Sequence, residues 1–149
     1  MTAASPNGTE SARVATVREY VRRVDLSDFP VELFADDFQF YVPKFGVGHG
    51  LADFLDMASG FTPAYSGIAH VIDLIAECGN VVLLEGRTSG HDAAGTVWRG
   101  GETPGGRFCS VFEFDDAAFI ARMHIYLDPD YTSQDRDRFR WNRGRAQQW

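Results

Sequence analysis

The sequence predicts an α+β fold in which a cone-like, curved antiparallel sheet packs on three N-terminal helices and encloses a pocket. Three observations indicate this fold: helical spacing of apolar residues near the N-terminus, β-like segments that follow one another later in the chain, and short connections between those segments. A length of 149 residues is typical of one domain with its own core. We expect a disordered tail over residues 1–9, the domain over 10–131, and a partly helical extension over 132–149.

The three predicted helices cover about residues 10–24, 31–35 and 51–60. In the first helix, four valines and Tyr20 recur at spacings that form one apolar face, and the arginines fall elsewhere. Asp25 and the Phe29-Pro30 pair are predicted to stop this helix, and Gly60 to close the third.

Strands are predicted wherever apolar residues alternate at a period of two. The first strand covers 38–42 and is bounded by Pro43, and the glycine-rich stretch after it is predicted as a loop. Because later segments follow one another with turn residues between them, they are expected to form an antiparallel meander. These segments are residues 68–76, 81–89, 108–114 and 119–127.

The last two segments show which side chains should face the pocket. If Phe112 pairs with Met123, Glu113 lies opposite Arg122 on the other face of the sheet. A slip of one residue would turn Arg122 and His124 toward the helices. We therefore expect Phe108, Phe112, Met123 and Ile125 to face inward, and Glu113, Arg122 and His124 to face outward.

The segment 81–89 has two faces that alternation alone does not distinguish. One face carries Leu83, Glu85, Arg87 and Ser89, and the other carries Val82, Leu84, Gly86 and Thr88. The segment begins with apolar residues on both faces, which is typical of a central strand covered on both sides. Such a strand would hold Glu85 and Arg87 within the pocket as a pair.

Composition excludes several classes of function. A formal net charge of −7 argues against binding to nucleic acids or anionic membranes, because both need a basic face. We find no apolar run of membrane-spanning length and no signal-peptide pattern, so we expect a cytoplasmic protein. Metal-binding motifs are absent from the sequence, and we expect neither metal nor cofactor.

Cys78 and Cys109 lie among apolar residues and are predicted to be reduced, buried thiols.

The order of these elements resembles the nuclear transport factor 2-like superfamily, in particular its SnoaL-like branch, which is related to ketosteroid isomerase and limonene epoxide hydrolase. The resemblance spans about residues 14–130 and implies a cone-shaped domain with an internal pocket. This fold hosts both enzymes and binding modules. The matching segments are Val17-Arg-Glu-Tyr-Val21, Leu33-Phe-Ala-Asp-Asp37, Val42-Pro43, Val111-Phe-Glu-Phe-Asp-Asp116 and Met123-His-Ile-Tyr-Leu-Asp128.

The resemblance to ketosteroid isomerase is incomplete at the site. Tyr20 falls where those enzymes keep the tyrosine of their oxyanion hole. Their catalytic carboxylate falls on Val42, and their second oxyanion donor, a protonated acid, falls on Ser110. Steroid isomerisation is therefore disfavoured.

The resemblance to limonene epoxide hydrolase is also partial. Arg87 matches, but the aspartates that activate water in those enzymes fall on Ser89 and Ile125. Epoxide hydrolysis is therefore disfavoured as well. The match at Arg87 nevertheless favours the inward orientation of the face that carries Glu85, Arg87 and Ser89.

Four residues are candidates for catalysis: His70, Glu85, Arg87 and Tyr20. Glu85 would move a proton while Arg87 held an enolate or carboxylate oxygen; alternatively, the two only satisfy one another as an ion pair. His70 is the best general base available, although a hydrogen-bonded structural role is the alternative. The predicted pocket lining is Phe40, Val42, Phe54, Leu83, Ser89, Phe108, Ser110, Phe112, Met123 and Ile125.

These observations predict a small-molecule enzyme that carries out cofactor-independent acid–base chemistry, namely cyclisation, isomerisation or dehydration. The 12 phenylalanines favour a hydrophobic, cyclic or polyketide-like ligand. The alternative is a non-catalytic module for hydrophobic-ligand binding or dimerisation. We also expect a homodimer through the convex face of the sheet, where Cys109, Val111 and Tyr126 lie beside Glu113 and Arg122.

Overall fold

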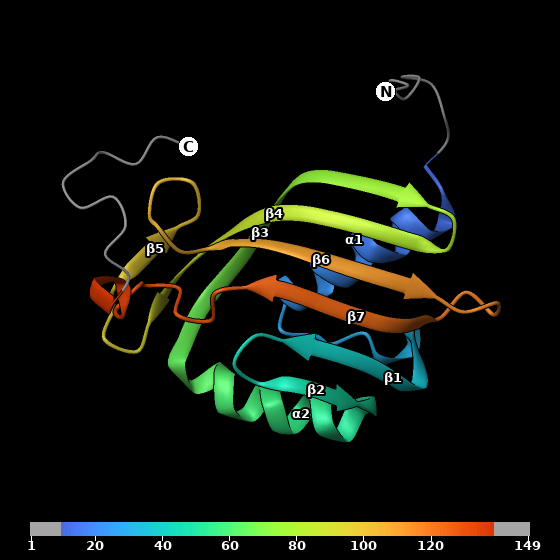
Figure 1. Ribbon diagram of the computed structural model, residues 1–149, viewed down its shortest axis with the longest axis horizontal. Coiled ribbons are helices and arrows are strands. Elements are labelled where there is room, and N and C mark those ends of the chain that lie inside the picture. Colours follow the sequence, from blue (N-terminus) through green and yellow to red (C-terminus); the bar gives the residue numbers. More distant parts are fainter. Residues whose placement is uncertain (1–9, 139–149) are drawn as a thin grey trace.

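A mixed sheet of seven strands, curved around its concave face, forms the frame of the protein (Figure 1). The computed structural model describes residues 10–138. Along the sheet the strand order is β2-β1-β7-β6-β4-β3, and β5 pairs with β4. The strands are β1 (Phe34–Val42), β2 (Gly46–His49), β3 (Tyr65–Cys78), β4 (Val81–Asp92), β5 (Val97–Arg99), β6 (Arg107–Phe114) and β7 (Ile120–Leu127).

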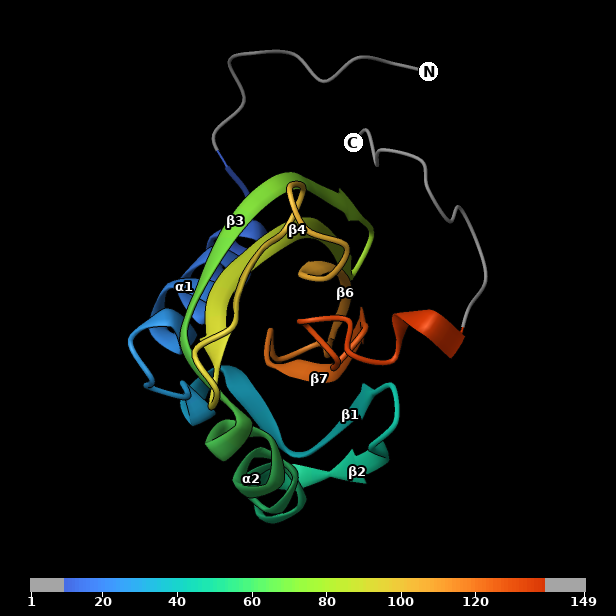
Figure 2. The same ribbon diagram turned by 90° about the vertical axis from the view of Figure 1, so that its left-hand side faces the viewer.

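Two α-helices complete the domain: α1 (Ala12–Asp25) and α2 (Gly50–Phe61). The first packs on β3 and β4 and the second on β1 and β2, so that helices and sheet surround a common interior (Figure 2). Ser11 caps α1 by accepting a hydrogen bond from the Val14 backbone N–H at 3.2 Å. Three short 3₁₀ turns lie outside these elements: η1 (Val31–Leu33), η2 (Thr62–Ala64) and η3 (Arg136–Arg138).

The α+β class and the curved sheet are confirmed, but the helix count and one strand direction differ from the prediction. The predicted second helix is only the turn η1, because Phe34 already belongs to β1 and packs its ring 4.6 Å from that of Phe38. β1 also runs parallel to β7, whereas all other neighbouring strands are antiparallel. The two are far apart in sequence, so no short turn forces them to run in opposite directions.

Two short strands lie in segments predicted as loops. In β2, Gly48 lies opposite Phe40, and the ring of Phe40 occupies the space that a Cβ at Gly48 would need. In β5, Trp98 is completely buried and its indole N–H donates to Thr88 Oγ1 at 3.1 Å. Each strand is too short and too rich in small or polar neighbours to show a clear alternation.

The predicted register of the β6–β7 hairpin is confirmed. Phe112 pairs with Met123, and Glu113 pairs with Arg122, whose Nε donates to Glu113 Oε2 at 2.8 Å. Phe112 and Met123 are fully buried in the core, which also contains Val17 of α1.

The predicted orientation of β4 is wrong. Its pairing with β6 aligns Leu84 with Ser110 and directs Leu84 inward, so Glu85 and Arg87 lie on the outer face. The Arg87 side chain is 39% exposed and forms hydrogen bonds of 2.8–3.0 Å with both carboxylate oxygens of Asp73 on β3. These hydrogen bonds hold the pKa of Asp73 below its usual value. Arg87 therefore satisfies its charge with Asp73 at the surface rather than with Glu85 in the interior.

The prediction of two buried cysteines is also wrong. Cys78 is exposed because it is the last residue of the edge strand β3, and Cys109 is half-buried on the outer face of β6. Both are free thiols.

Several expectations concern regions beyond these elements. The predicted N-terminal tail over residues 1–9, and residues 139–149 of the predicted C-terminal extension, lie outside the described residues. Among the helices of residues 10–138, none is both long and apolar enough to cross a membrane.

Candidate functional site

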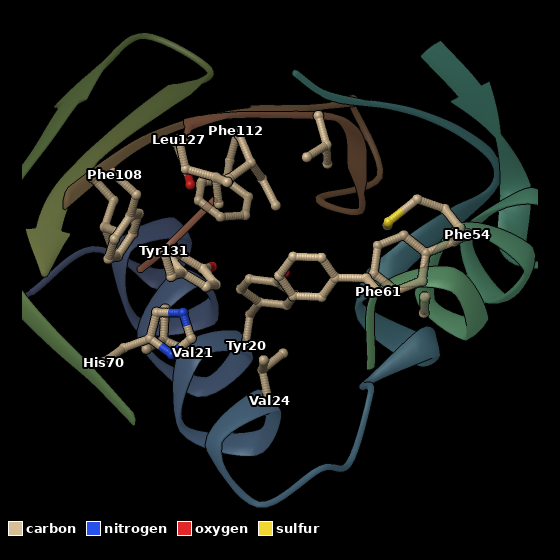
Figure 3. Close-up of a pocket in the computed structure, with 16 residues that line it drawn as sticks. Tyr20, Val21, Val24, Phe54, Phe61, His70, Phe108, Phe112, Leu127 and Tyr131 are labelled. Carbon is tan, nitrogen blue, oxygen red and sulfur yellow. The ribbon is translucent and has the colours of Figure 1, made fainter. Parts of the chain in front are cut away.

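A cavity of about 170 Å³ lies between the two α-helices and the concave face of the sheet (Figure 3). Aromatic and aliphatic side chains form most of its wall, and no Lys, Arg, Asp or Glu is among the described residues that line it. A roughly 150 Å³ apolar cavity can hold a benzene ring, so this volume suits one ring of a ligand. The lining residues are Tyr20, Val21, Val24, Val42, Phe54, Met57, Ala58, Phe61, His70, Leu84, Phe108, Ser110, Phe112, Ile125, Leu127 and Tyr131.

The periodicity of each element explains which side chains reach the cavity. On α1, Tyr20 and Val24 are four residues apart and lie on one face of the helix. On β6, alternate residues from Phe108 to Phe112 point inward. Gly86 on β4 leaves room for the ring of Phe108, which would clash with a Cβ at that position.

His70 lies on β3 at the wall of this cavity and is held by Asp25, the last residue of α1. The Asp25 Oδ1 lies 2.5 Å from the His70 ring Nδ1, and the Asp25 Oδ2 accepts the His70 backbone N–H at 3.1 Å. A carboxylate can only accept, so Nδ1 carries the proton and Nε2 keeps its lone pair. The ring also stands edge-on to Phe108 at 5.3 Å, which fixes its plane.

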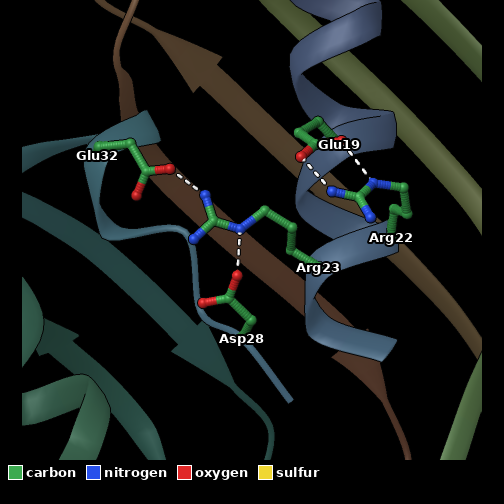
Figure 4. A network of polar contacts seen from close by, with 5 residues as sticks. All are labelled: Glu19, Arg22, Arg23, Asp28 and Glu32. Carbon is green, nitrogen blue, oxygen red and sulfur yellow. Dashed lines mark hydrogen bonds and ion pairs between the residues drawn. The ribbon is translucent and has the colours of Figure 1, made fainter. Parts of the chain in front are cut away.

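The end of α1 is held in place by a cluster of ion pairs (Figure 4). Arg23 donates to Asp28 at 2.7 Å and also bonds Glu32, which ties α1 to the segment that follows it. The hydrogen bond from Arg23 lowers the pKa of Asp28. Within α1, Arg22 forms two 2.7 Å hydrogen bonds with Glu19. The cluster therefore fixes the chain on both sides of Asp25.

Three hydroxyl groups also face the cavity, from Tyr20, Ser110 and Tyr131. These residues are 8%, 3% and 3% exposed, and none of the three hydroxyls has a hydrogen-bond partner among residues 10–138. Burial raises the pKa of Tyr20 and of Tyr131, so both phenols stay protonated and can donate. The site thus combines one acceptor nitrogen with three hydroxyl donors inside an apolar wall.

The structure places the residues predicted from sequence in three groups. The cavity wall contains His70 and Tyr20 together with Val42, Phe54, Phe108, Ser110, Phe112 and Ile125. Phe40 and Met123 point inward but are buried in the core beside the cavity. Leu83, Glu85, Arg87 and Ser89 lie on the outer face, so the predicted Glu85–Arg87 site in the pocket is wrong.

Sequence reasoning missed two residues of the site. The sequence predicts Asp25 only as a helix stop, although an acidic residue at a helix C-terminus opposes the helix dipole and so suggests another role. Tyr131 follows β7 in a segment without regular periodicity, which carries no signal of orientation. In the part of the chain that the structure describes, no group of three or more His, Cys, Asp or Glu residues is arranged to hold a metal ion.

The sequence model of the SnoaL-like domain matches residues 14–123, which is most of the chain. The chain belongs to the SnoaL-like family. Among curated proteins, no sequence matches it.

Solved structures share the SnoaL-like fold at low sequence identity. An NTF2-like protein of unknown function from Burkholderia pseudomallei aligns with a TM-score of 0.71 and 17% identity, over 80% of this chain and 93% of that one. A putative SnoaL-like polyketide cyclase from Jannaschia sp. aligns with a TM-score of 0.67 and 12% identity, over 82% and 92%. TerC, crystallised with polyporic acid, aligns with a TM-score of 0.67 and 16% identity, over 79% and 92%.

Proposed function

We propose that this SnoaL-like protein is a cofactor-independent enzyme that moves protons on a hydrophobic, cyclic or polyketide-like ligand. The observation that carries the proposal is the His70–Asp25 pair at the wall of an apolar cavity, with Nδ1 and Oδ1 2.5 Å apart. A histidine oriented by a carboxylate is a recurrent arrangement in general-base catalysis. The reaction would be a cyclisation, an isomerisation or a dehydration.

His70 Nε2 would remove a proton from a carbon next to a ligand carbonyl. The electron pair of the broken C–H bond would form an enolate, and the proton on Nε2 would then return to another carbon or to a leaving hydroxyl. Asp25 would stabilise the imidazolium during this interval without touching the ligand. Hydroxyl groups that line the same cavity would donate to the enolate oxygen.

The aromatic character of the wall supports a flat ligand. Phe54, Phe61, Phe108 and Phe112 surround the space, and aromatic rings stack well on other rings. The named neighbours agree with this choice, since one is a putative polyketide cyclase and another was crystallised with polyporic acid.

Two mechanisms known from related folds do not suit this site. At the positions that the resemblance assigns to catalytic carboxylates, the cavity has Val42 and Ile125, and Ser89 lies outside it. The proposed base is therefore a histidine from β3 rather than a carboxylate from β1, β4 or β7.

Hydrogen–deuterium exchange tests the proposal without knowledge of the natural substrate. Acetophenone is a neutral one-ring ketone, and its methyl protons exchange in D₂O through the enol or the enolate. We expect the protein to accelerate this exchange without added cofactor, and His70→Ala to lower the rate by about 10²-fold. His91→Ala, which changes an exposed histidine outside the cavity, is the matched control.

Two results would overturn the proposal. One is a rate of hydrogen–deuterium exchange that is equally high with His70→Ala and with the wild type. The other is that the protein binds acetophenone and larger ring ketones but does not accelerate their exchange. That second result would favour the alternative of a non-catalytic ligand-binding module.

We also propose that the convex face of the sheet pairs with a second copy of the chain. Leu83 on β4 and Tyr126 on β7 are 41% and 47% exposed there. Charges of both signs lie beside them, including the Glu113–Arg122 pair, so a two-fold related copy could present complementary charges.

Light scattering at micromolar concentration should give a dimer that Leu83→Arg dissociates, whereas Val97→Arg on β5 should leave it intact. A monomeric wild type would refute this assembly.

A further inference from the structure

Tyr131 belongs to the segment that follows β7 and lines the cavity together with Tyr20 of α1 (Figure 3). Its ring is stacked on Trp98 with centroids 4.6 Å apart and an interplanar angle of 9°. Phe61 and Tyr65 contact it edge-on at 5.8 and 5.0 Å. The ring is therefore packed by residues from three different elements.

The backbone of this segment is fixed as well. The Tyr65 hydroxyl donates to the Pro129 carbonyl at 2.6 Å. The Tyr131 carbonyl lies so close to Gly105 that a Cβ there would overlap it. Trp98, on which the ring is stacked, is itself anchored by its hydrogen bond to Thr88. Tyr131 is thus held in one position before any ligand binds.

The hydroxyls of Tyr20 and Tyr131 have no protein partner in the described chain, yet both residues are more than nine-tenths buried. Each hydroxyl is open to the cavity and is not enclosed by protein atoms, so each is available to donate a hydrogen bond to an acceptor inside it. Both residues line the same cavity of about 170 Å³, whose volume suits a single ring. One bound ligand therefore lies within reach of both hydroxyls.

We propose that Tyr20 and Tyr131 together donate two hydrogen bonds to a single carbonyl oxygen of a neutral ring ligand. This inference rests on the proposed function, because that oxygen gains charge when His70 removes a proton from the adjacent carbon. Two phenol donors beside a histidine base restrict the class of ligand to neutral, enolisable carbonyl compounds. A carboxylate or phosphate is disfavoured, since no described lining residue carries a positive charge other than a protonated His70.

Tyr131 is therefore a catalytic residue of this site, although it lies outside the helices and strands. Two phenols fixed by packing can donate to an enolate oxygen with little reorganisation. Ser110 faces the same cavity from β6 and is available to a second oxygen of the ligand.

Binding of a ketone and of its matched hydrocarbon tests this inference. Acetophenone labelled with ¹³C at the carbonyl is compared with ethylbenzene, which lacks the oxygen. Tyr20→Phe and Tyr131→Phe should each weaken acetophenone binding about three- to tenfold, the range expected for one neutral hydrogen bond. Ethylbenzene affinity should stay unchanged in both variants, which also shows that the cavity is intact.

The carbonyl ¹³C shift gives a second readout that a purely structural role would not alter. Donated hydrogen bonds move this resonance downfield, so each variant should show a smaller displacement on binding. Tyr126→Phe is the matched control, because Tyr126 is an exposed tyrosine on the outer face of β7 and does not line the cavity. A shift and an affinity in Tyr131→Phe equal to those of the wild type would overturn the inference, as would failure of the wild type to bind acetophenone.

The two proposals can fail separately. If the protein does not accelerate hydrogen–deuterium exchange, but the carbonyl ¹³C shift of bound acetophenone depends on Tyr131, the paired donors are supported and the enzyme assignment is wrong. If exchange depends on His70, but the carbonyl ¹³C shift does not depend on Tyr131, the enzyme assignment is supported and the paired donors are wrong.

Discussion

Asp25 binds His70 through both carboxylate oxygens, one to the ring Nδ1 at 2.5 Å and one to the backbone N–H at 3.1 Å. The two residues are 45 positions apart in the chain, and the packing of α1 on β3 brings them together. A carboxylate at a helix C-terminus is unfavourable by about 0.3–1 kcal/mol when exposed. The contact with His70 offsets this cost and gives the imidazole a defined tautomer.

Asp25→Asn tests the role of this contact. An amide can present its N–H to Nδ1, which would move the ring proton to Nε2 and remove the proposed base. We expect ketone exchange to fall by about 10²-fold or more, with the affinity for ethylbenzene unchanged. ¹⁵N resonances of the imidazole should report the change of tautomer. Asp116→Asn, which alters an exposed carboxylate in the turn between β6 and β7, should retain the wild-type rate.

The inward face of β6 is tested by Phe112→Ala. Phe112 is completely buried and its ring packs 5.4 Å from that of Tyr20. We expect a loss of about 3–5 kcal/mol in the free energy of unfolding, measured by urea denaturation. Phe119→Ala, at a 43% exposed phenylalanine, should cost much less. Similar losses in the two variants would show that the core is not where the structure places it.

The two cysteines should differ in reactivity with a thiol reagent. Cys78 is exposed, whereas burial and then the nearby Glu85 raise the pKa of Cys109, so its reactive thiolate form is scarce. In native protein we expect one rapid and one slow thiol. Cys78→Ser should remove the rapid phase, and Cys109→Ser should remove the slow one. Two rapid phases of equal rate would contradict the half-buried position of Cys109.

His124 should contribute to the pH dependence of stability. It contacts Gln39 at 2.9 Å and Arg122 at 3.4 Å, and Glu113 is nearby. Burial, followed by the charge of Arg122, holds the pKa of His124 below its ordinary value of 6.5. As the pH falls, the unfolded chain therefore takes up a proton on His124 before the folded protein does. The contribution of neutral His124 to stability is present above pH 6.5 and declines as the pH falls below this value.

His124→Gln should consequently flatten the stability profile. Gln cannot titrate, so the variant should lose less stability than the wild type between about pH 7.5 and about pH 5. Thermal unfolding over this range measures the difference. A steeper decline in the variant would mean that the folded state, rather than the unfolded one, takes up the proton more readily.

The sequence by itself determined the elements whose apolar residues form one clear stripe. The valine spacing of α1 identified Tyr20 as inward-facing, and the alternation in β6 and β7 set Phe112 opposite Met123. In these segments one face is apolar and the other polar, so only one orientation avoids burying charge without a partner. The α+β class followed from the same patterns.

Tertiary structure alone decided the orientation of β4 and the composition of the site. Val81 to Leu84 are apolar on both faces, so alternation could not show that Arg87 points outward, where Asp73 on β3 neutralises it. The partnership of Asp25 with His70 and the entry of Tyr131 into the cavity depend on contacts between segments far apart in the chain. The local periodicity of a sequence shows only which face of a helix or strand is apolar. The functional site forms where faces of several elements lie together, and their relative positions depend on the packing of the whole domain.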